Sequence, residues 1–273
     1  MLCAVIAVDM RGRMGNQMFQ VAFAYAAGRR LGTSFAVLGP FELAEHFERV
    51  PLGRPSIRLA TKTMFYLRHG PAKRVFVDDA SDPAELMETL HNGIPYSGFF
   101  QSAQYFAGYE QEIRGIFQVR REHAAAFEHG YGQIGRYVCM HLRRGDYLET
   151  GWALPESYFR DALATIPGCS ELPVIVVSDD IRRAREDCSW LERARFVANP
   201  PAVDLQLLMN ATAVIASNSS FSWWGGWLNE RPDATIVAPA SWLGVATGIE
   251  QPPWVIPPNW IRVPVAPPSR LVP

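Results

Sequence analysis

Apolar and polar positions follow one repeated order along much of the chain: a short apolar run, a polar or glycine-containing turn, and a segment with apolar residues at helical spacing. The first repeat is Leu2–Val8, a turn at residues 11–16, and a helical segment at Gln17–Arg30. The order returns after the apolar runs Tyr137–Leu142 and Val174–Val177. Strands that alternate with helices predict right-handed βαβ units around a parallel sheet.

The same signals predict further elements. Strands are expected at residues 34–38, 213–216 and 235–237, and helices at 83–91, 155–164, 204–210 and from about 221. Residues 40–130 otherwise mix glycines, prolines and aromatics without a clear period. Ligands of parallel sheets bind beyond the carboxyl ends of the strands, which is where the polar clusters of this chain fall.

Composition narrows the classes of function. The 273 residues are 48% hydrophobic and 19% charged, as in a packed globular protein. The net charge is -1 and the pI about 6.6, so no general basic field favours a nucleic-acid partner, and any bound anion needs a local cluster. The four cysteines lie far apart with no Cys-x-x-Cys pair, which argues against disulfides or a zinc site and fits a reducing cytosol. The apolar N-terminus is too short to span a membrane and lacks a basic leader, so we interpret it as a buried strand.

The first candidate cluster is His-Leu-Arg-Arg-Gly-Asp-Tyr at residues 141–147. Arg143 and Arg144 at a strand's carboxyl end can offer forked donors to a diphosphate, and Gly145 permits a tight turn. An ordinary surface ion pair between an arginine and Asp146 explains the same pattern. His141 belongs to the cluster, although a lone histidine there is often a hydrogen-bonded structural residue.

The second cluster is Ser-Asn-Ser-Ser-Phe-Ser-Trp-Trp-Gly-Gly at residues 217–226. Small hydroxyl residues between a strand and a helix start leave backbone N–H groups for a phosphate, assisted by the helix dipole. N-capping explains one serine, but it does not call for four serines within six residues. We interpret the tryptophans as core residues.

The third cluster is Gly-Arg-Met-Gly-Asn-Gln at residues 12–17. It has neither the Gly-x-Gly-x-x-Gly spacing nor a Walker lysine, which disfavours a Rossmann oxidoreductase or a P-loop protein. We predict a close-approach loop that places Asn16 and Gln17 over a cleft.

Adjacent acids at Asp179 and Asp180 are the only metal-like pattern. Helix capping by Asp180 explains the pair equally well, and no histidine or carboxylate cluster completes a site. We therefore predict that no metal is bound.

Together these motifs resemble the family 11 glycosyltransferases, the α-1,2-fucosyltransferases. The resemblance extends in order over most of the chain. It rests on Gly-Arg-Met-Gly-Asn-Gln-Met-Phe-Gln from Gly12, His-Leu-Arg-Arg-Gly-Asp-Tyr from His141, Leu-Pro-Glu-Ser-Tyr from Leu154, Ser-Asp-Asp-Ile from Ser178, and Asn-Ser-Ser-Phe-Ser-Trp-Trp-Gly from Asn218.

The resemblance implies an α/β fold of the GT-B-like type, with two Rossmann-like lobes and a cleft between them. We place the N-terminal acceptor-side lobe at residues 1–130 and the GDP-fucose-binding lobe at 131–250. A proline-rich tail at 251–273 is expected to pack back on the lobes.

The resemblance also implies the reaction and its residues. L-fucose would pass with inversion from GDP-fucose to the 2-hydroxyl of a galactosyl acceptor glycan, without a metal or other cofactor. Arg143 would hold the β-phosphate, Asp204 the guanine edge, and Asn16 would lie near the reacting centre. Asp146 is a candidate base or a brace for an arginine. The remaining donor-binding residues implied are Gly15, His141, Arg144, Asn218, Ser219, Ser220 and Phe221.

Two alternatives are kept: a fucosyltransferase of α-1,6 or protein O-linked type, and a non-catalytic GDP-sugar-binding protein. The expected partners are GDP-fucose and an oligosaccharide, with neither nucleic acid nor an obligatory protein partner. By analogy with bacterial surface-polysaccharide assembly, we expect a cytoplasmic location and leave open peripheral association with the inner face of the plasma membrane.

Overall fold

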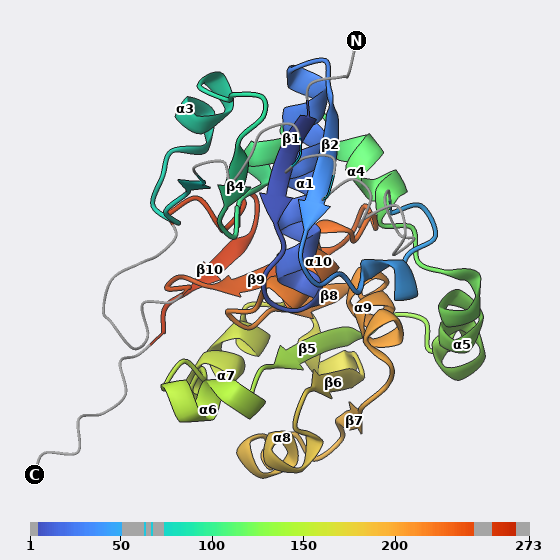
Figure 1. Cartoon of the computed structure of the whole chain (residues 1–273). Helices are drawn as coiled ribbons and strands as arrows, with labels where there is room; N and C mark the ends of the chain where they lie inside the picture. The colour runs from blue at the N-terminus through green and yellow to red at the C-terminus, as the bar shows by residue number, and fades with distance from the viewer. Residues whose placement is uncertain (1–4, 51–62, 64–66, 68–73, 243–252, 266–273) are drawn as a thin grey trace, which may run out of the picture. The chain divides into compact units, whose positions relative to one another are not determined.

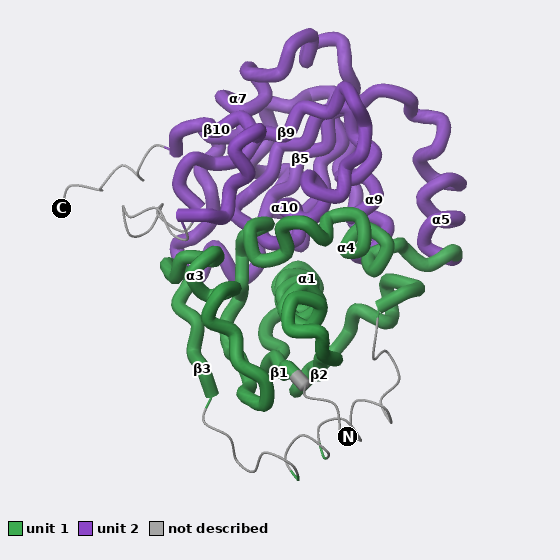
Figure 2. Tube along the Cα trace, turned by 90° about the horizontal axis from the view of Figure 1, so that it is seen from above, with its two compact units in different colours: residues 1–121 green, residues 122–273 purple. Residues whose placement is uncertain are grey.

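The computed structural model describes residues 5–50, 63, 67, 74–242 and 253–265. The chain forms two compact units, residues 1–121 and residues 122–273 (Figure 2). It passes from one unit to the other beside the helix α5 (Arg121–Tyr131), somewhat before the predicted boundary at residue 130.

Unit 1 contains a parallel sheet of four strands in the order β2-β1-β4-β3 (Figure 1). The strands are β1 (Val5–Asp9), β2 (Ser34–Leu38), β3 (Val75–Phe76) and β4 (Pro95–Ser97). The helix α1 (Met14–Arg30) connects β1 to β2 and packs against both. As predicted, β2 spans residues 34–38, whereas α1 begins at Met14 rather than Gln17.

The other helices in the described part of unit 1 are short. They are the 3-10 turns η1 (Leu43–Glu45) and η2 (Ala103–Phe106), and the helices α3 (Pro83–Glu88) and α4 (Glu110–Ile116). The helix predicted at 83–91 ends at Glu88.

Aromatic residues from the segment without a clear period form part of the core of unit 1. Phe100 stacks on Phe23 of α1 at a centroid distance of 3.9 Å, and Tyr96 and Tyr105 meet Phe23 edge to face. All four rings are at most 3% exposed. Their aromatic character therefore reflects packing rather than ligand contact.

Unit 2 contains a parallel sheet of six strands in the order β10-β9-β8-β5-β6-β7. The strands are β5 (Val138–Leu142), β6 (Val174–Ser178), β7 (Arg195–Val197), β8 (Ala213–Ile215), β9 (Thr235–Pro239) and β10 (Ile261–Val263). The chain builds outward from β5 to β7, then returns to β5 and builds outward on the other side. This is the order of dinucleotide-binding folds, whose ligands bind where the direction reverses. In unit 2 that switch point lies between β5 and β8.

Helices connect the strands of unit 2. They are α6 (Gly145–Thr150), α7 (Glu156–Ala164), α8 (Ile181–Asp187), α9 (Pro201–Met209) and α10 (Ser220–Trp227), with a 3-10 turn η3 (Cys169–Glu171).

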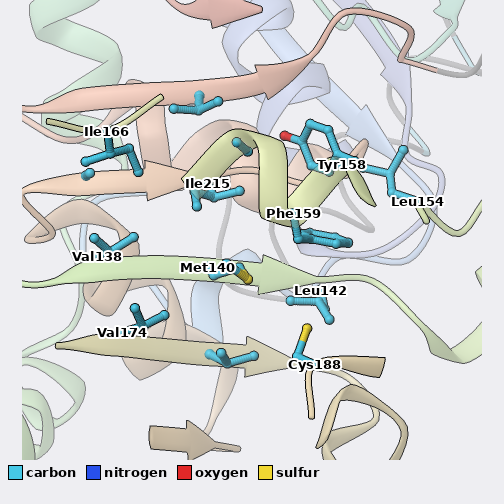
Figure 3. Packing of buried hydrophobic residues seen from close by; sticks show 14 of the residues in the cluster. Val138, Met140, Leu142, Leu154, Tyr158, Phe159, Ile166, Val174, Cys188 and Ile215 are labelled. Carbon is cyan, nitrogen blue, oxygen red and sulfur yellow. The ribbon is translucent and has the colours of Figure 1, made fainter. Parts of the chain in front are cut away.

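The sheet of unit 2 is buried on both faces. Successive side chains of β5 point to opposite faces and therefore enter two different hydrophobic clusters. Val138, Met140 and Leu142 pack with Tyr158 and Phe159 of α7 (Figure 3). Cys139 lies in a second cluster with residues of α9. It is a free, fully buried core cysteine, as its apolar run predicted.

The predicted strands and helices of unit 2 are present, with bounds shifted by at most a few residues. Prediction missed β7, which is only three residues long and begins with Arg195. It also missed β10, which lies in the expected proline-rich tail yet pairs in parallel with β9. Within the described ranges, no helix combines the length and apolarity of a membrane span.

Candidate active site

The switch point of unit 2 brings the first two candidate clusters together. The first cluster follows β5 and the second follows β8, and these strands are hydrogen-bonded neighbours. His141 Nδ1 lies 2.8 Å from Ser217 Oγ. Tyr147 Oη donates to the carbonyl oxygen of Asn218 at 3.2 Å. Two segments about 75 residues apart in sequence thus form one site.

His141 is a neutral member of this site. It is 5% exposed, and its ring centroid lies 5.3 Å from that of Phe221. Burial, with the positive charges of Arg143 and Arg144, lowers the pKa of His141 to about 3. The imidazole is therefore uncharged near neutral pH, and one of its nitrogens is already engaged by Ser217. Its chemistry is that of a fixed hydrogen-bonding group.

Arg143 is held by two carboxylates. Its Nη2 lies 2.7 Å from Asp146 Oδ1, and its Nη1 lies 3.0 Å from Asp179 Oδ2. The guanidinium carbon also lies 5.3 Å from the ring centroid of Tyr147. The side chain remains 15% exposed. These contacts fix the guanidinium at the carboxyl edge of β5 before any ligand arrives.

Asp146 therefore braces Arg143, which was one of the two roles predicted for it. The ion pair foreseen as the ordinary explanation of the cluster is also present. This pair differs from an isolated surface pair, because Asp146 and Asp179 both contact the mostly buried guanidinium of Arg143.

Arg144 has different surroundings from Arg143. Its side chain is 2% exposed, and its Nε lies 2.6 Å from Asp187 Oδ2 at the end of α8. The guanidinium carbon stands 5.4 Å from the ring centroid of Phe159 in the core. The side chains of adjacent residues at a strand end point to opposite sides. Arg143 therefore lies at the sheet edge, and Arg144 lies between the sheet and its helices. The Arg144 side chain therefore packs within the fold, and donor binding by this residue stays a prediction.

Asp179 is a site residue that the sequence analysis considered only as a metal ligand. Its Oδ1 accepts from the backbone N–H of Arg144 at 2.8 Å, while Oδ2 pairs with Arg143. The sequence offered only a general signal, because strands that follow one another in a βαβ unit are often neighbours and their carboxyl ends then meet. Asp180, in contrast, caps α8 by accepting from the N–H of Arg183 at 3.0 Å, which confirms the capping interpretation.

The second cluster opens the helix α10. Ser219 is the N-cap residue, with extended backbone and no side-chain capping bond. The hydroxyl of Ser222 turns back to the carbonyl oxygens of Ser217 and Ser219. The first-turn N–H groups of α10, including those of Ser220 and Phe221, thus lack a side-chain cap, a geometry suited to an anion.

Other members of the second cluster hold its loop in place. Asn218 is 1% exposed, and its Nδ2 donates to the carbonyl oxygen of Trp152 at 2.9 Å. Ser220 and Phe221 are partly exposed. Trp223 and Trp224 are fully buried, which confirms their assignment to the core.

The role of Tyr158 in the Leu-Pro-Glu-Ser-Tyr segment becomes clear only from the fold. Its buried hydroxyl donates to the carbonyl oxygen of Ala216, the residue immediately before Ser217. Tyr158 therefore positions the second cluster from beneath.

Asp204 lies in the first turn of α9 and is 8% exposed. Asn199 donates to its carboxylate from Nδ2 at 2.7 Å and from the backbone N–H at 3.3 Å. Burial nevertheless raises the pKa of Asp204 to about 7, against the two hydrogen bonds that lower it. The carboxyl group can thus change charge near neutral pH.

The third cluster lies in unit 1 and departs from the loop that was predicted. Gly15, Asn16 and Gln17 belong to the first turn of α1. Gln17 is 3% exposed and is bound to backbone groups of Gly12 and Glu42, so its role is structural. Gly15 is also buried.

Asn16 is partly exposed, and its Oδ1 accepts from Gln101 Nε2 at 3.0 Å. Gly12 has φ of 70°, and a Cβ there would meet the Asn16 amide. The absence of a side chain at Gly12 therefore leaves room for the Asn16 amide. The placement of Asn16 near the reacting centre stays a prediction.

Candidate metal ligands do not gather in the described part of the chain: no group of three or more His, Cys, Asp or Glu residues there could hold an ion. An arginine fork and an uncapped helix start at the switch point of a parallel sheet are typical of nucleotide-binding α/β proteins. This is the class that the fold and the site define.

The sequence profile named Glycosyl transferase family 11 matches residues 85–261, which is more than half of the chain. The chain belongs to this family, and the predicted resemblance is confirmed. It is therefore a glycosyltransferase.

Its relatives include two proteins of Escherichia coli. An alpha-1,2-colitosyltransferase is 26% identical over 88% of this chain and 93% of its own length. The O-antigen biosynthesis glycosyltransferase WbnK is 27% identical over 86% of this chain and 93% of its own length. The galactoside 2-alpha-L-fucosyltransferase Sec1 of Mus musculus is 25% identical over 90% of this chain and 75% of its own length.

Among solved structures, the fucosyltransferase NodZ from Bradyrhizobium has a TM-score of 0.52 at 14% identity, over 81% of this chain and 91% of NodZ. At that identity the likeness shows the fold alone. The predicted fold class, α/β and GT-B-like, is confirmed.

Proposed function

We propose that the chain transfers L-fucose from GDP-fucose to the 2-hydroxyl of a galactosyl acceptor, with inversion at the anomeric carbon. The observation that carries this proposal is Arg143, fixed by two carboxylates after β5, while the uncapped helix α10 begins after the neighbouring strand β8 at the switch point of unit 2. Support for the sugar and the linkage comes from family membership and from the mouse galactoside 2-alpha-L-fucosyltransferase.

The site suits a departing diphosphate. In the displacement, the acceptor oxygen bonds to the anomeric carbon while the bond from that carbon to the β-phosphate oxygen breaks. Negative charge grows on the diphosphate, and the forked donors of Arg143 would receive it. The N–H groups at the start of α10 would bind the same diphosphate, assisted by the helix dipole. Neither set needs to reorganise, because both are held by contacts already described.

Nucleoside recognition would come from residues around the same switch point. His141 and Phe221 offer neighbouring ring surfaces for guanosine. Asp204, when ionised, would accept hydrogen bonds from the guanine edge. The hydroxyls of Ser219 and Ser220 would line the diphosphate and ribose.

The proton of the acceptor hydroxyl leaves as the new bond forms and passes to the departing diphosphate or to water. Because Asp146 accepts from Arg143, we assign it to holding that guanidinium rather than to proton removal. Asn16 is proposed to orient the acceptor, as the family resemblance implies.

Colitosyl transfer is a second candidate, favoured by the similarity to the E. coli alpha-1,2-colitosyltransferase. Colitose lacks one hydroxyl of fucose, so the two donors differ by a single polar group. A site that hydrogen-bonds this hydroxyl should reject the deoxy sugar strongly, whereas a site with apolar surroundings should accept both.

The test is initial-rate kinetics of the purified full chain with GDP-fucose or GDP-colitose, lactose as acceptor, and EDTA or added Mg²⁺. We expect acceptor-dependent release of GDP, equal rates in EDTA, and an α-1,2 linkage in the product. A different linkage would favour the other fucosyltransferase classes. GDP-fucose binding without release would favour a non-catalytic binding protein, and a rate that collapses in EDTA would contradict metal independence.

The setting proposed for this activity is assembly of a bacterial surface polysaccharide on the cytoplasmic side of the membrane, supported by the similarity to the O-antigen glycosyltransferase WbnK. Acceptors built on lipid carriers would then bring the enzyme to the membrane surface.

A further inference from the structure

Unit 1 has a cavity at the carboxyl edge of its own sheet. Its volume is about 500 Å³. Asp9 ends β1 and Arg11 follows it, Leu38 ends β2 and Gly39 follows it, and Arg74 immediately precedes β3, which ends at Phe76. None of these residues was assigned a role by the motifs. The position nevertheless matches the edge at which parallel sheets bind ligands.

The register of the sheet places three of the lining residues in one row. Asp9 pairs with Leu38, and Phe76 pairs with Ser97. The register of β1 with β4, in which Val8 pairs with Tyr96, puts Ser97 level with Asp9. Residues level with one another in a parallel sheet point to the same face. Asp9 and Phe76 therefore rise from the same face, two strands apart, at a separation of about 10 Å.

The polar side of the cavity is a fixed ion pair. Arg74 Nε lies 2.7 Å from Asp9 Oδ2, with side-chain exposures of 40% and 15%. The pair offers carboxylate lone pairs and guanidinium N–H groups side by side. Arg11 adds a second exposed guanidinium, while its backbone N–H is bound by Gln20. A ligand that both donates and accepts many hydrogen bonds fits this combination.

The apolar side of the cavity is the ring of Phe76, which is 71% exposed. One exposed aromatic residue is ordinary on a protein surface. Phe76, however, lies at the wall of a cavity whose other wall is charged. A pyranose has the same two-sided character, with an apolar C–H face and a rim of hydroxyls.

We propose that this cavity binds a neutral hexose of the acceptor glycan, with its hydroxyls on Asp9 and Arg74 and its C–H face on Phe76. The inference rests on the proposed glycosyl transfer, because only that reaction makes the bound hexose an acceptor. Sugar binding by the cavity does not itself require turnover. It assigns acceptor recognition to residues of unit 1 outside the Gly12–Gln17 cluster.

The test uses two single variants of the full chain, Phe76→Ala and Asp9→Asn, with lactose as the probe. Lactose binding is followed by saturation-transfer NMR, GDP affinity by calorimetry, and transfer by initial rates. Each variant should weaken lactose binding and raise KM for lactose by about tenfold, the loss expected for one charged hydrogen bond or one stacked ring. GDP affinity should stay at the wild-type value, and kcat should change by less than about threefold.

Matched variants separate recognition from folding. Phe76→Trp keeps an aromatic face and should retain lactose binding, whereas Phe76→Ala should not. Glu112→Gln removes an exposed carboxylate of α4 that does not line the cavity, and it should bind lactose as wild type does. Because Phe76 is mostly exposed, its replacement should leave the melting temperature unchanged even if Asp9→Asn lowers it.

The outcomes distinguish the two proposals. Unchanged lactose binding and KM in Phe76→Ala would overturn the acceptor site while leaving glycosyl transfer intact. Lactose binding that depends on Phe76 in a protein with no turnover would support the cavity and contradict the proposed function. Stronger binding of an acidic disaccharide than of lactose would overturn the assignment to a neutral hexose.

Discussion

Gly145 lies so close to Asp179 that a Cβ at this glycine would stand 2.5 Å from Asp179 Oδ2. That oxygen is the one paired with Arg143, so the missing side chain of Gly145 is what lets the carboxylate reach the guanidinium. Gly145 is thus required because the space left by its missing Cβ lets Asp179 hold Arg143. A positive φ angle is not the reason.

Gly145→Ala should therefore impair transfer by displacing Asp179. We expect kcat/KM to fall by about tenfold or more, because a guanidinium that has lost one brace no longer meets the leaving group in a fixed position. Gly130→Ala is the matched control, since nothing lies within 4 Å of a Cβ there. That change in α5 should leave the kinetics unaltered and slightly raise stability. Equal kinetics in the two variants would count against the bracing role.

Arg143→Ala should lower kcat by a factor on the order of a hundred or more, as for the loss of one preorganised donor to developing charge. Arg143→Lys should recover only part of this loss, because an ammonium group lacks the fork that meets both carboxylates and the diphosphate. Single-turnover rates with GDP-fucose and lactose provide the measurement. Arg182→Ala is the control, since Arg182 is 79% exposed and paired only with Glu186 on α8. Turnover of Arg143→Ala within a few-fold of wild type would rule out the assigned role.

Arg144→Met should act on stability rather than on donor binding. Removing the buried guanidinium leaves Asp187 without its closest partner, and we expect the free energy of unfolding to fall by about 3 kcal/mol. Urea unfolding measures this loss, and the double variant Arg144→Met with Asp187→Leu should recover part of it. GDP affinity of the folded protein should not change. A selective loss of GDP affinity with unaltered stability would support Arg144 as a donor-binding residue.

The predicted pH dependence of GDP binding comes from Asp204. Its pKa of about 7 means that the ionised form, which can accept from the guanine edge through both oxygens, gains population as the pH rises through 7. GDP affinity should therefore increase between about pH 6 and about pH 8 and then level off. In Asp204→Asn the affinity should be lower and this dependence absent. Calorimetry across this range, with Asp161→Asn as an exposed control, decides the matter.

The same group has an opposite effect on folding. A carboxyl whose pKa is raised in the folded state keeps a proton that the unfolded chain releases. Its contribution to stability is thus fully present below about pH 4 and is lost as the pH rises toward 7. Stability should therefore decline over a range in which GDP affinity has begun to rise. Asp204→Asn should remove this part of the decline.

The sequence was most informative where local periodicity and turn chemistry agree. The strand–turn–helix repeats of unit 2 were predicted within a few residues, and the polar clusters were correctly placed at strand ends. What periodicity does not carry is strand order. The meeting of His141 with Ser217, and of Arg143 with Asp179, depends on which strands are neighbours, and that is decided by packing across the whole sheet.

Two further limits of the sequence have a local cause. Arg143 and Arg144 were both placed among the donor-binding residues, because a sequence does not say which of two adjacent side chains faces the sheet edge and which faces the helix layer. Gly15 was read as part of a loop, although Gly12 alone makes the turn and α1 has already begun at Met14. The strands β3 and β4 are too short for any alternation to show.

The helix α10 is contacted by residues 255–260, which come after β9 in the sequence. Val255 accepts a hydrogen bond from Trp223, and a Cβ on Gly226 would stand 3.2 Å from the ring of Trp260. The neighbouring residues 261–263 supply the outermost strand of the sheet. During synthesis, then, the proposed nucleotide site lacks this support as its own residues leave the ribosome. It must wait until a stretch more than thirty residues downstream of Phe221 has emerged, so nascent chains halted earlier should not yet hold GDP.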